Sequence, residues 1–369
     1  MPLRVAILLQ HWLLGGAERQ ALHVARALQA KGHHLELWSL EGAHPGAAQA
    51  LERARAGGLT TVDAGHGRST MARVLAVSAR LRARRIDVVL PFTVTPNLVA
   101  AASWRLGGAR GSVWNQRDSY LDLGVARAFV ARQATVYVSN AEPVRARVPG
   151  AFGVDAARCL CIPNILDPAV ALRTVAQWRK ALALAADARV IVSLARLHPK
   201  KRIDLAIRAL AAMKVGASMV VAGLDQGALS SLREVARSLG VEGRVRFPGH
   251  VDDVTGLLAA CDAGIYTSSP AGEAWGEGSS NAVLEVVTAG LPCVCVDDPA
   301  IRAFVDPADI AADTPAALAA ALDGALTDPG ARPRAAVRAE ALRKRHAPEV
   351  VVPLWEEALL RAARARGTA

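Results

Sequence analysis

RVAILL at residues 4–9 is followed by a helical period at residues 17–30 and by HLELW at residues 34–38. The first run is apolar at every position after Arg4, which is typical of a strand that is covered on both faces. The helical stretch ends at Lys31-Gly32, a good signal for the C-terminal end of a helix. A strand, a helix and a second strand in this order predict a parallel βαβ unit.

The same alternation extends over the rest of the chain. Pro163-Asn164-Ile165-Leu166-Asp167-Pro168 separates two series of apolar runs and is typical of a linker. We therefore predict two doubly wound α/β domains, residues 1–168 and 169–345, with late helices at 331–345 and 349–366. The further candidate strands are residues 87–90, 111–114, 135–138 and 159–162 before the linker, and 189–195, 218–222, 244–247, 263–266 and 293–296 after it.

The composition is that of a folded globular protein. Of 369 residues, 52% are hydrophobic and 21% are charged, which excludes a disordered chain. No apolar run approaches the roughly 20 residues of a membrane span, and residues 5–9 are too short for a signal peptide. The cysteine pairs 159/161 and 293/295 have the spacing of one strand face rather than of a metal site. We therefore expect a cytoplasmic protein with buried thiols.

Positive charge is concentrated in the first half, because residues 1–170 carry +9 of the net +11. Such a half suits a nucleic acid, an anionic membrane or an anionic substrate. Nucleic acid is disfavoured, since the chain lacks aromatic interleaving, zinc-ligand spacing and a recognition helix. A predicted helix at residues 68–85 either makes peripheral contact with the inner face of an anionic membrane or is a solvated face. Its arginines are Arg68, Arg73, Arg80, Arg82, Arg84 and Arg85.

Two loops that follow predicted strands have features of phosphate sites. Gly15-Gly16 opens the first predicted helix, where free N–H groups and a close approach of the backbone suit a phosphate or a sugar. The alternative is that the two glycines only form a tight turn. Arg196 and Lys201 lie in the loop after the first strand of the second series. A guanidinium fork and a compact ammonium suit a diphosphate, although an exposed basic loop is the alternative.

The most informative segment is Glu273-Ala-Trp-Gly-Glu277-Gly278-Ser279-Ser280-Asn281-Ala-Val-Leu-Glu285. Glu277 in the loop and Glu285 in the helix can point into one cleft, where carboxylates accept hydrogen bonds from sugar hydroxyls. Gly278, Ser279 and Ser280 offer N–H groups at the helix N-terminus to a phosphate. The segment therefore predicts one site for a sugar, a diphosphate and a ribose.

In order and spacing these segments resemble the family 4 glycosyltransferases, retaining enzymes of the GT-B fold that use nucleotide sugars. Residues 277–285 followed by Ala289-Gly290-Leu291-Pro292 resemble the family's E-x7-E segment, residues 15–18 its GGAE loop, and residues 193–197 with Lys201 its GRL…K element. The resemblance covers essentially the whole chain. It implies two Rossmann-like domains that face a central cleft, with residues 346–369 as a helix returning to the N-terminal domain.

The resemblance also implies a role for each site residue. Glu285 would bind the ribose and Glu277 the hydroxyls of the donor sugar, while Arg196 and Lys201 would hold the diphosphate and stabilise its departure. No metal and no other cofactor is then required. The donor is expected to be a UDP-sugar and the acceptor a sugar, a lipid-linked or a small-molecule hydroxyl. The remaining donor-binding candidates are Gly15, Gly16, Val251, Gly278, Ser279, Ser280 and Asn281.

The sequence departs from the family pattern at several positions. Many relatives place a histidine near the reacting sugar, where this chain has Trp114-Asn115-Gln116-Arg117-Asp118. Asn115, Arg117 and Asp118 are therefore the acceptor-side candidates. Ala195, Arg202 and Ile165 stand where the family often has glycine.

Two alternatives remain, an epimerase and a non-catalytic subunit, while an oxidoreductase is poorly supported. A hydrolysing nucleotide-sugar epimerase shares the GT-B shape but not the E-x7-E spacing. A non-catalytic partner subunit would have no need of Arg196, Lys201, Glu277 and Glu285. A Rossmann oxidoreductase would carry the G-x-G-x-x-G fingerprint, which is missing. We therefore expect a retaining transferase in glycan, lipid-linked saccharide or glycoconjugate biosynthesis.

Overall fold

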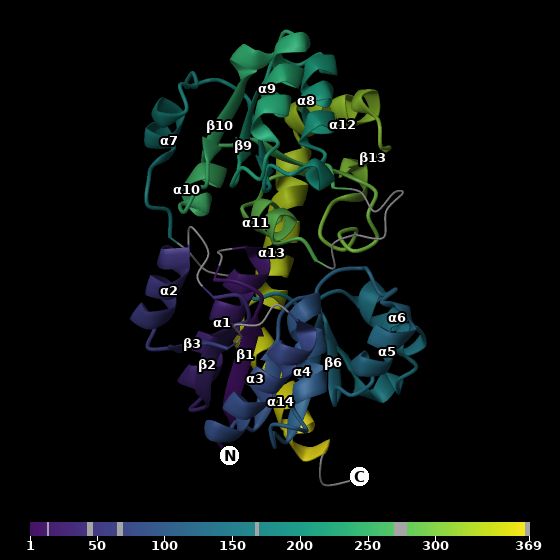
Figure 1. The fold of residues 1–369 in the computed structure, drawn as a ribbon. Coiled ribbons are helices and arrows are strands. Elements are labelled where there is room, and N and C mark those ends of the chain that lie inside the picture. The colour runs from purple at the N-terminus through teal and green to yellow at the C-terminus, as the bar shows by residue number, and fades with distance from the viewer. Residues whose placement is uncertain (13–14, 43–46, 65–68, 167–169, 269–278, 366–369) are drawn as a thin grey trace. The chain divides into compact units, whose positions relative to one another are not determined.

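The computed structural model describes residues 1–12, 15–42, 47–64, 69–166, 170–268 and 279–365. These residues form two compact units, each built on one sheet (Figure 1). Unit 1 comprises the described residues up to 166, Ser279, and the stretch from His346 onward. Unit 2 comprises the described residues from 170 to 268 and from Ser280 to Arg345.

Unit 1 contains a parallel sheet with the strand order β3-β2-β1-β4-β5-β6-β7. In the interior strand at residues 4–9, Val5 and Ile7 belong to one apolar cluster, whereas Ala6 and Leu8 belong to another. The strand is thus covered on both faces, as its continuous apolar run predicts. The strands are β1 (Arg4–Leu9), β2 (His34–Ser39), β3 (Thr60–Asp63), β4 (Val88–Pro91), β5 (Gly111–Gln116), β6 (Val136–Ser139) and β7 (Cys159–Cys161).

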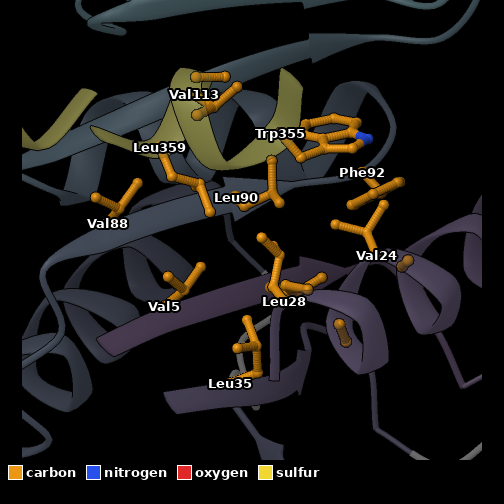
Figure 2. Close-up of a cluster of buried hydrophobic side chains, with 14 of the residues drawn as sticks. Val5, Val24, Leu28, Leu35, Val88, Leu90, Phe92, Val113, Trp355 and Leu359 are labelled. Carbon is orange, nitrogen blue, oxygen red and sulfur yellow. The ribbon is translucent and has the colours of Figure 1, made fainter. Parts of the chain in front are cut away.

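The last helix of the chain, α14 (Pro348–Arg364), completes the core of unit 1. Trp355 and Leu359 pack among the side chains of β4 and β5, and the ring of Trp355 stacks on Phe92 with 6.2 Å between centroids (Figure 2). Burying an apolar side chain of this size contributes about 1.5–3 kcal/mol. The other helices of unit 1 are α1 (Gly16–Ala30), α2 (Ala47–Ala56), α3 (Thr70–Ala83), α4 (Val94–Ser103), α5 (Gly124–Ala131), α6 (Glu142–Phe152) and the 3-10 helix η1 (Ala156–Arg158).

Unit 2 repeats the architecture with a smaller parallel sheet of order β10-β9-β8-β11-β12-β13. Its strands are β8 (Val190–Leu194), β9 (Ser218–Ala222), β10 (Val245–Gly249), β11 (Ala263–Tyr266), β12 (Cys293–Val296) and β13 (Ile310–Ala311). Its helices are α7 (Val175–Ala181), α8 (Ile203–Ala212), α9 (Leu229–Ser238), α10 (Val254–Ala259), α11 (Asn281–Thr288), α12 (Pro315–Thr327) and α13 (Ala331–Arg345), with 3-10 helices η2 (Pro199–Lys201), η3 (Glu242–Arg244) and η4 (Pro307–Asp309).

The doubly wound α/β prediction is confirmed, and most predicted elements shift by one or two residues. Strands β1, β9, β11 and β12 and helix α13 have the predicted bounds. The edge strands β3 and β13 were not predicted, because β3 buries none of its residues fully and β13 has only two residues. Among the described residues, no helix combines the length and the apolar character that crossing a bilayer requires.

Candidate functional site

Two loops that carry predicted site residues follow strands at which the strand order of a sheet reverses. In unit 1 the reversal lies between β1 and β4, and in unit 2 it lies between β8 and β11. Loops that leave the carboxyl ends of such strands diverge to opposite faces of the sheet, which opens a crevice for a ligand. The loops after β1 and β8 carry Gly15-Gly16 and Arg196–Lys201, respectively.

In unit 2, the loop after β8 is fixed by bonds on both sides. The Leu197 N–H donates to the carbonyl oxygen of Leu224 at 2.9 Å, and Thr267 Oγ1 donates to that of Lys201 at 2.9 Å. Gly223 permits the close packing, since a Cβ there would lie 1.9 Å from the carbonyl oxygen of Ala195. The loop is therefore held in place before any ligand arrives.

This loop brings two cations together. Arg196 is exposed and Lys201 is half-buried. Burial lowers the pKa of the Lys201 ammonium to about 8, and the positive charge of Arg196 lowers it further in the same direction. A bound diphosphate would reverse both effects, because its negative charge favours the protonated amine. The pair thus has the electrostatics of an anion site.

Arg202 occupies a backbone conformation that suits glycine. Its φ is 50°, in the left-handed region, at the junction between η2 and α8. An L-residue there costs roughly 1–2 kcal/mol. The side chain makes an ion pair with Asp313, which offsets part of that cost and explains how this chain tolerates the departure from the family's glycine.

The segment that contains the predicted carboxylates is described only from Ser279 onward. Glu277 and Gly278 lie outside the described residues. Ser280 caps α11, with its Oγ accepting from the Val283 N–H at 3.4 Å. Asn281 and Glu285 are four residues apart on this helix, both half-buried, so that they share one face. Val251 is half-buried just after β10.

In unit 1, the N-terminus of α1 lies beside a carboxylate of the chain itself. Gly15 precedes the helix, and a Cβ on Gly15 would lie 2.5 Å from Glu18 Oε2. A carboxylate in the first turn of a helix is favourable, because the N–H groups there carry partial positive charge. Glu18 therefore lies at the end of the helix that Gly15 and Gly16 were predicted to offer to a phosphate.

Arg117 lies just beyond β5 and is held by three neighbours. Its Nη2 donates to Asn164 Oδ1 at 2.6 Å, and its guanidinium carbon is 5.3 Å from the centre of the Phe92 ring. Burial lowers the pKa of the guanidinium to about 10, and the negative charge of Glu18 opposes that change. Arg117 is thus a positioned cation in a setting that already contains one anion.

Asn164 joins segments that are far apart in the sequence, and it was not predicted as a site residue. Its Oδ1 also accepts from Asn140 at 3.4 Å, while its Nδ2 donates to the carbonyl oxygen of Ser279 at 3.3 Å. His346 Nδ1 lies 2.7 Å from the carbonyl oxygen of Asn164. The sequence predicts Asn164 only as part of the linker at residues 163–168, and nothing in it links Asn164 to Ser279 or His346.

The residue after Asn164 is fixed by α1. The Ile165 N–H donates to Gln20 Oε1, and Gln20 Nε2 donates back to the carbonyl oxygen of Ile165, both at 2.8 Å. Gln20 is buried, and a buried amide that makes both bonds to one peptide group is strongly oriented. Gln20 is a second residue that sequence reasoning missed.

The remaining acceptor-side candidates, Asn115 and Asp118, differ in their exposure to solvent. Asn115 is fully buried within β5, and its amide atoms have no hydrogen-bond partner among the described residues. The side chain of Asn97, from α4, instead bonds both backbone groups of Asn115 at 2.9 Å. Asp118 is half-buried, and burial raises the pKa of its carboxyl to about 6 against the lowering effect of the Tyr120 N–H and Gln116.

A metal site is not evident in the described part of the chain, where no group of three or more His, Cys, Asp and Glu side chains is placed to hold an ion. The sequence has two pairs of neighbouring aspartates, at residues 252–253 and 297–298, and one member of each pair has a structural partner. Asp253 caps α10 and accepts from Trp178 Nε1 at 2.8 Å, while Asp297 pairs with Arg302 at 2.5 Å.

Comparisons with known proteins agree with this picture. The family model described as Glycosyltransferase Family 4 matches residues 14–170, and the model described as Glycosyl transferases group 1 matches residues 174–344. The chain is 36% identical over 122 residues to the lipopolysaccharide core biosynthesis glycosyltransferase LpsE of Rhizobium meliloti (strain 1021). That match spans 33% of this chain and only about a third, 34%, of the relative's length.

Solved structures resemble nearly the whole chain. The structure of Anabaena Alr3699/HepE in complex with UDP and glucose has a TM-score of 0.83 at 19% identity, and covers 97% of this chain and 99% of that one. The structure of WaaG, a glycosyltransferase involved in lipopolysaccharide biosynthesis, has a TM-score of 0.70 at 18% identity, and covers 99% of this chain and 100% of that one. At such identities the likeness shows the GT-B fold. With two family models that together match nearly all of its length, the chain belongs to the family 4 glycosyltransferases.

Proposed function

We propose that this chain transfers a sugar from a UDP-sugar to an acceptor hydroxyl. The observation that carries the proposal is the pair Arg196 and Lys201, two cations side by side on a fixed loop at the strand-order reversal of unit 2. Family membership supports the reaction class. The choice of UDP is supported by the relative Alr3699/HepE, which has been crystallised with UDP-glucose.

On the donor side, Arg196 and Lys201 bind the diphosphate, and Glu285 binds the ribose. Ser279, Ser280 and Asn281 contribute polar groups near the N-terminus of α11, and Val251 packs against the nucleotide. Glu277 and Gly278, outside the described residues, take the donor-sugar hydroxyls and a phosphate oxygen. Gly15 and Gly16 add backbone amides once the Glu18 carboxylate gives way to the phosphate.

The chemistry requires negative charge to leave with the nucleotide. The acceptor oxygen forms a bond to the anomeric carbon while the bond from that carbon to the β-phosphate oxygen breaks. The hydroxyl proton passes to a β-phosphate oxygen of the departing UDP, on the same face, so that configuration is retained. Arg196 and Lys201 stabilise the developing charge, and no metal ion is needed for that purpose.

On the acceptor side, Arg117 and Asp118 contact the acceptor. Both are partly exposed at the carboxyl end of β5, whereas Asn115 is buried behind them and supports the strand end. The relatives LpsE and WaaG, which are named for lipopolysaccharide biosynthesis, favour a growing glycan as acceptor. A glycan attached to lipid would bring the protein to the cytoplasmic membrane.

Membrane contact is therefore part of the proposal, supported by the excess positive charge of residues 1–170. Helix α3 fits this role less well than its sequence predicts. Arg73 pairs with Glu41 and Arg84 pairs with Glu36, both at 3.1 Å, and Arg82 donates to the carbonyl oxygen of Leu106 at 2.7 Å. Arg68 lies outside the described residues, while Arg80 is half-buried and Arg85 is exposed.

The test is a panel of nucleotide sugars incubated with the purified chain, first without acceptor and then with truncated lipid-linked glycans. We expect UDP to raise the melting temperature, slow hydrolysis of one UDP-sugar, and transfer with retention when a suitable acceptor is added. Product analysis without acceptor separates hydrolysis from epimerisation. The proposal would be overturned if no nucleoside diphosphate raised the melting temperature of the protein.

A further inference from the structure

On the basis of the proposed membrane contact, we infer that α5 and the hollow beside it form the surface that binds an anionic lipid bilayer. We call this surface the α5 face; it comprises residues 121–132 together with Arg147 and Ala151. The inference assigns the membrane contact to one place in unit 1 and to one kind of partner.

Helix α5 is only weakly buried although it is rich in apolar residues. Of its eight residues, only Ala131 is buried. Val125 is 92% exposed and Phe129 is 64% exposed, and their spacing of four residues places them on one face. An exposed aromatic and aliphatic pair costs free energy in water, and such patches mark interaction sites.

The helix borders a hollow in the surface of unit 1. Its volume is about 580 Å³, within the range of sites that take small molecules or parts of lipids. Leu121, Leu123 and Ala128 supply apolar walls, and Ala151 closes the side formed by α6. Phe129 lines the hollow and is also exposed at the surface, so apolar contact can extend from the surface into the hollow.

The charge around this face is positive. Arg132 and Arg147 line the hollow, and both bond to carbonyl oxygens: Arg132 Nε donates to Phe152 at 2.6 Å and Arg147 Nη1 to Ser119 at 3.3 Å. A carbonyl acceptor leaves the charge of a guanidinium unneutralised. Arg127 is exposed on the helix itself, and Asp122 is the one carboxylate among the lining residues that the structure describes.

Apolar side chains surrounded by unneutralised arginines match the boundary between lipid headgroups and acyl chains. The arginines meet anionic headgroups, while Val125 and Phe129 enter the apolar layer beneath them. A nucleic acid would pair its phosphates with the arginines but would leave the side chain of Val125 exposed to water. The chemistry therefore favours an anionic bilayer.

Helix α3 offers a matched control. Met71 and Leu75 are 68% and 58% exposed and are also four residues apart. This helix, however, is anchored by four buried residues, and several of its arginines are bonded within unit 1. A loss of two exposed apolar side chains from α3 should therefore leave bilayer binding nearly unchanged.

The experiment is flotation of the purified full chain with vesicles of phosphatidylcholine that contain roughly one third phosphatidylglycerol. We expect the wild type to float with these vesicles, and binding to weaken in high salt and with pure phosphatidylcholine. Val125→Ser/Phe129→Ser should lower the bound fraction by about fivefold or more, and Arg127→Glu by about threefold. Met71→Ser/Leu75→Ser should stay within about twofold of the wild type.

The melting temperature and the UDP-induced shift are measured for each variant, so that unfolding and loss of donor binding are recognised separately. The α5 assignment is overturned if the α5 variants float like the wild type, if the α3 variant shows the loss instead, or if the wild type does not float at all. The change in melting temperature on addition of UDP is independent of these results, and it tests the transferase proposal separately.

Discussion

The carboxyl edges of the two sheets have the same topology but carry different charge. In unit 1 the cation at this edge, Arg117, is hydrogen bonded to Asn164 and has the carboxylate of Glu18 nearby. In unit 2 the neighbour that acts on Lys201 is a second cation, Arg196. One edge is therefore close to neutral within itself, whereas the other is suited to an external anion. Under the proposed function, a few side chains adapt the same architecture to the acceptor in unit 1 and to the donor in unit 2.

The strongest test of this difference removes the charges of Arg196 and Lys201 in unit 2. Arg196→Ala/Lys201→Ala should lower kcat/KM for the donor by about 10³-fold or more, since both charges act on the leaving diphosphate in the transition state. Lys200→Ala, a charge loss at the exposed neighbouring position, is the matched control and should change kcat/KM by less than about threefold. Equal effects in both variants would show that only general charge matters.

The unit 1 edge is tested by Arg117→Ala. We expect transfer to the acceptor to fall by about 10- to 100-fold through lost positioning, while the Kd for UDP changes little. Arg110→Ala provides the control, because Arg110 precedes β5 as Arg117 follows it. If UDP affinity fell as much as transfer, Arg117 would belong to the donor site and the proposed division would be wrong.

The depressed pKa of Lys201 predicts a pH dependence that Arg117 lacks. Because this pKa is about 8 in the free protein, the ammonium is charged at pH 7 and loses its proton as the pH rises through 8. The affinity for UDP should therefore fall by up to about tenfold between pH 7 and pH 9, with proton uptake on binding. Titration calorimetry in buffers of different ionisation enthalpy measures both; Lys201→Arg should abolish the pH dependence in this range.

The smallest effects concern two asparagines of unit 1. Asn164→Ala should lower the free energy of unfolding by about 1–3 kcal/mol, because it leaves Arg117 and the other partners of Asn164 unsatisfied. Asn115→Ala should cost less than about 1 kcal/mol, since its amide bonds to none of the described residues. Urea unfolding gives both values, and a larger loss for Asn115 would indicate a buried water that the amide holds.

Local patterns were enough to predict most strands of both sheets and the elements that carry part of the candidate site. Strand β11 precedes the segment that carries Glu277, and helix α11, which contains Glu285, begins next to Ser280 because that serine caps it. Likewise, the loop after β8 follows from a buried strand that ends before a run of basic residues. These features depend on neighbours within a few residues, which a sequence pattern records directly.

The unit 1 edge could not be predicted in the same way. Asn164 meets Ser279 and His346, which are 115 and 182 residues away in the chain. No periodicity records such a meeting, and the side chain of Glu18 was likewise taken as part of a loop motif rather than as a group lying against Gly15. Contacts of this kind depend on the complete fold.

Helix α14 has a consequence for how the protein is made. Trp355 and Leu359 fill the core of unit 1, yet they leave the ribosome only after the whole of unit 2. During synthesis, the apolar faces of β4 and β5 therefore stay incompletely covered until Trp355, 239 residues after the end of β5, has been translated, and unit 2 has the opportunity to fold first. Completion of the unit 1 core thus depends on residues that are translated after unit 2.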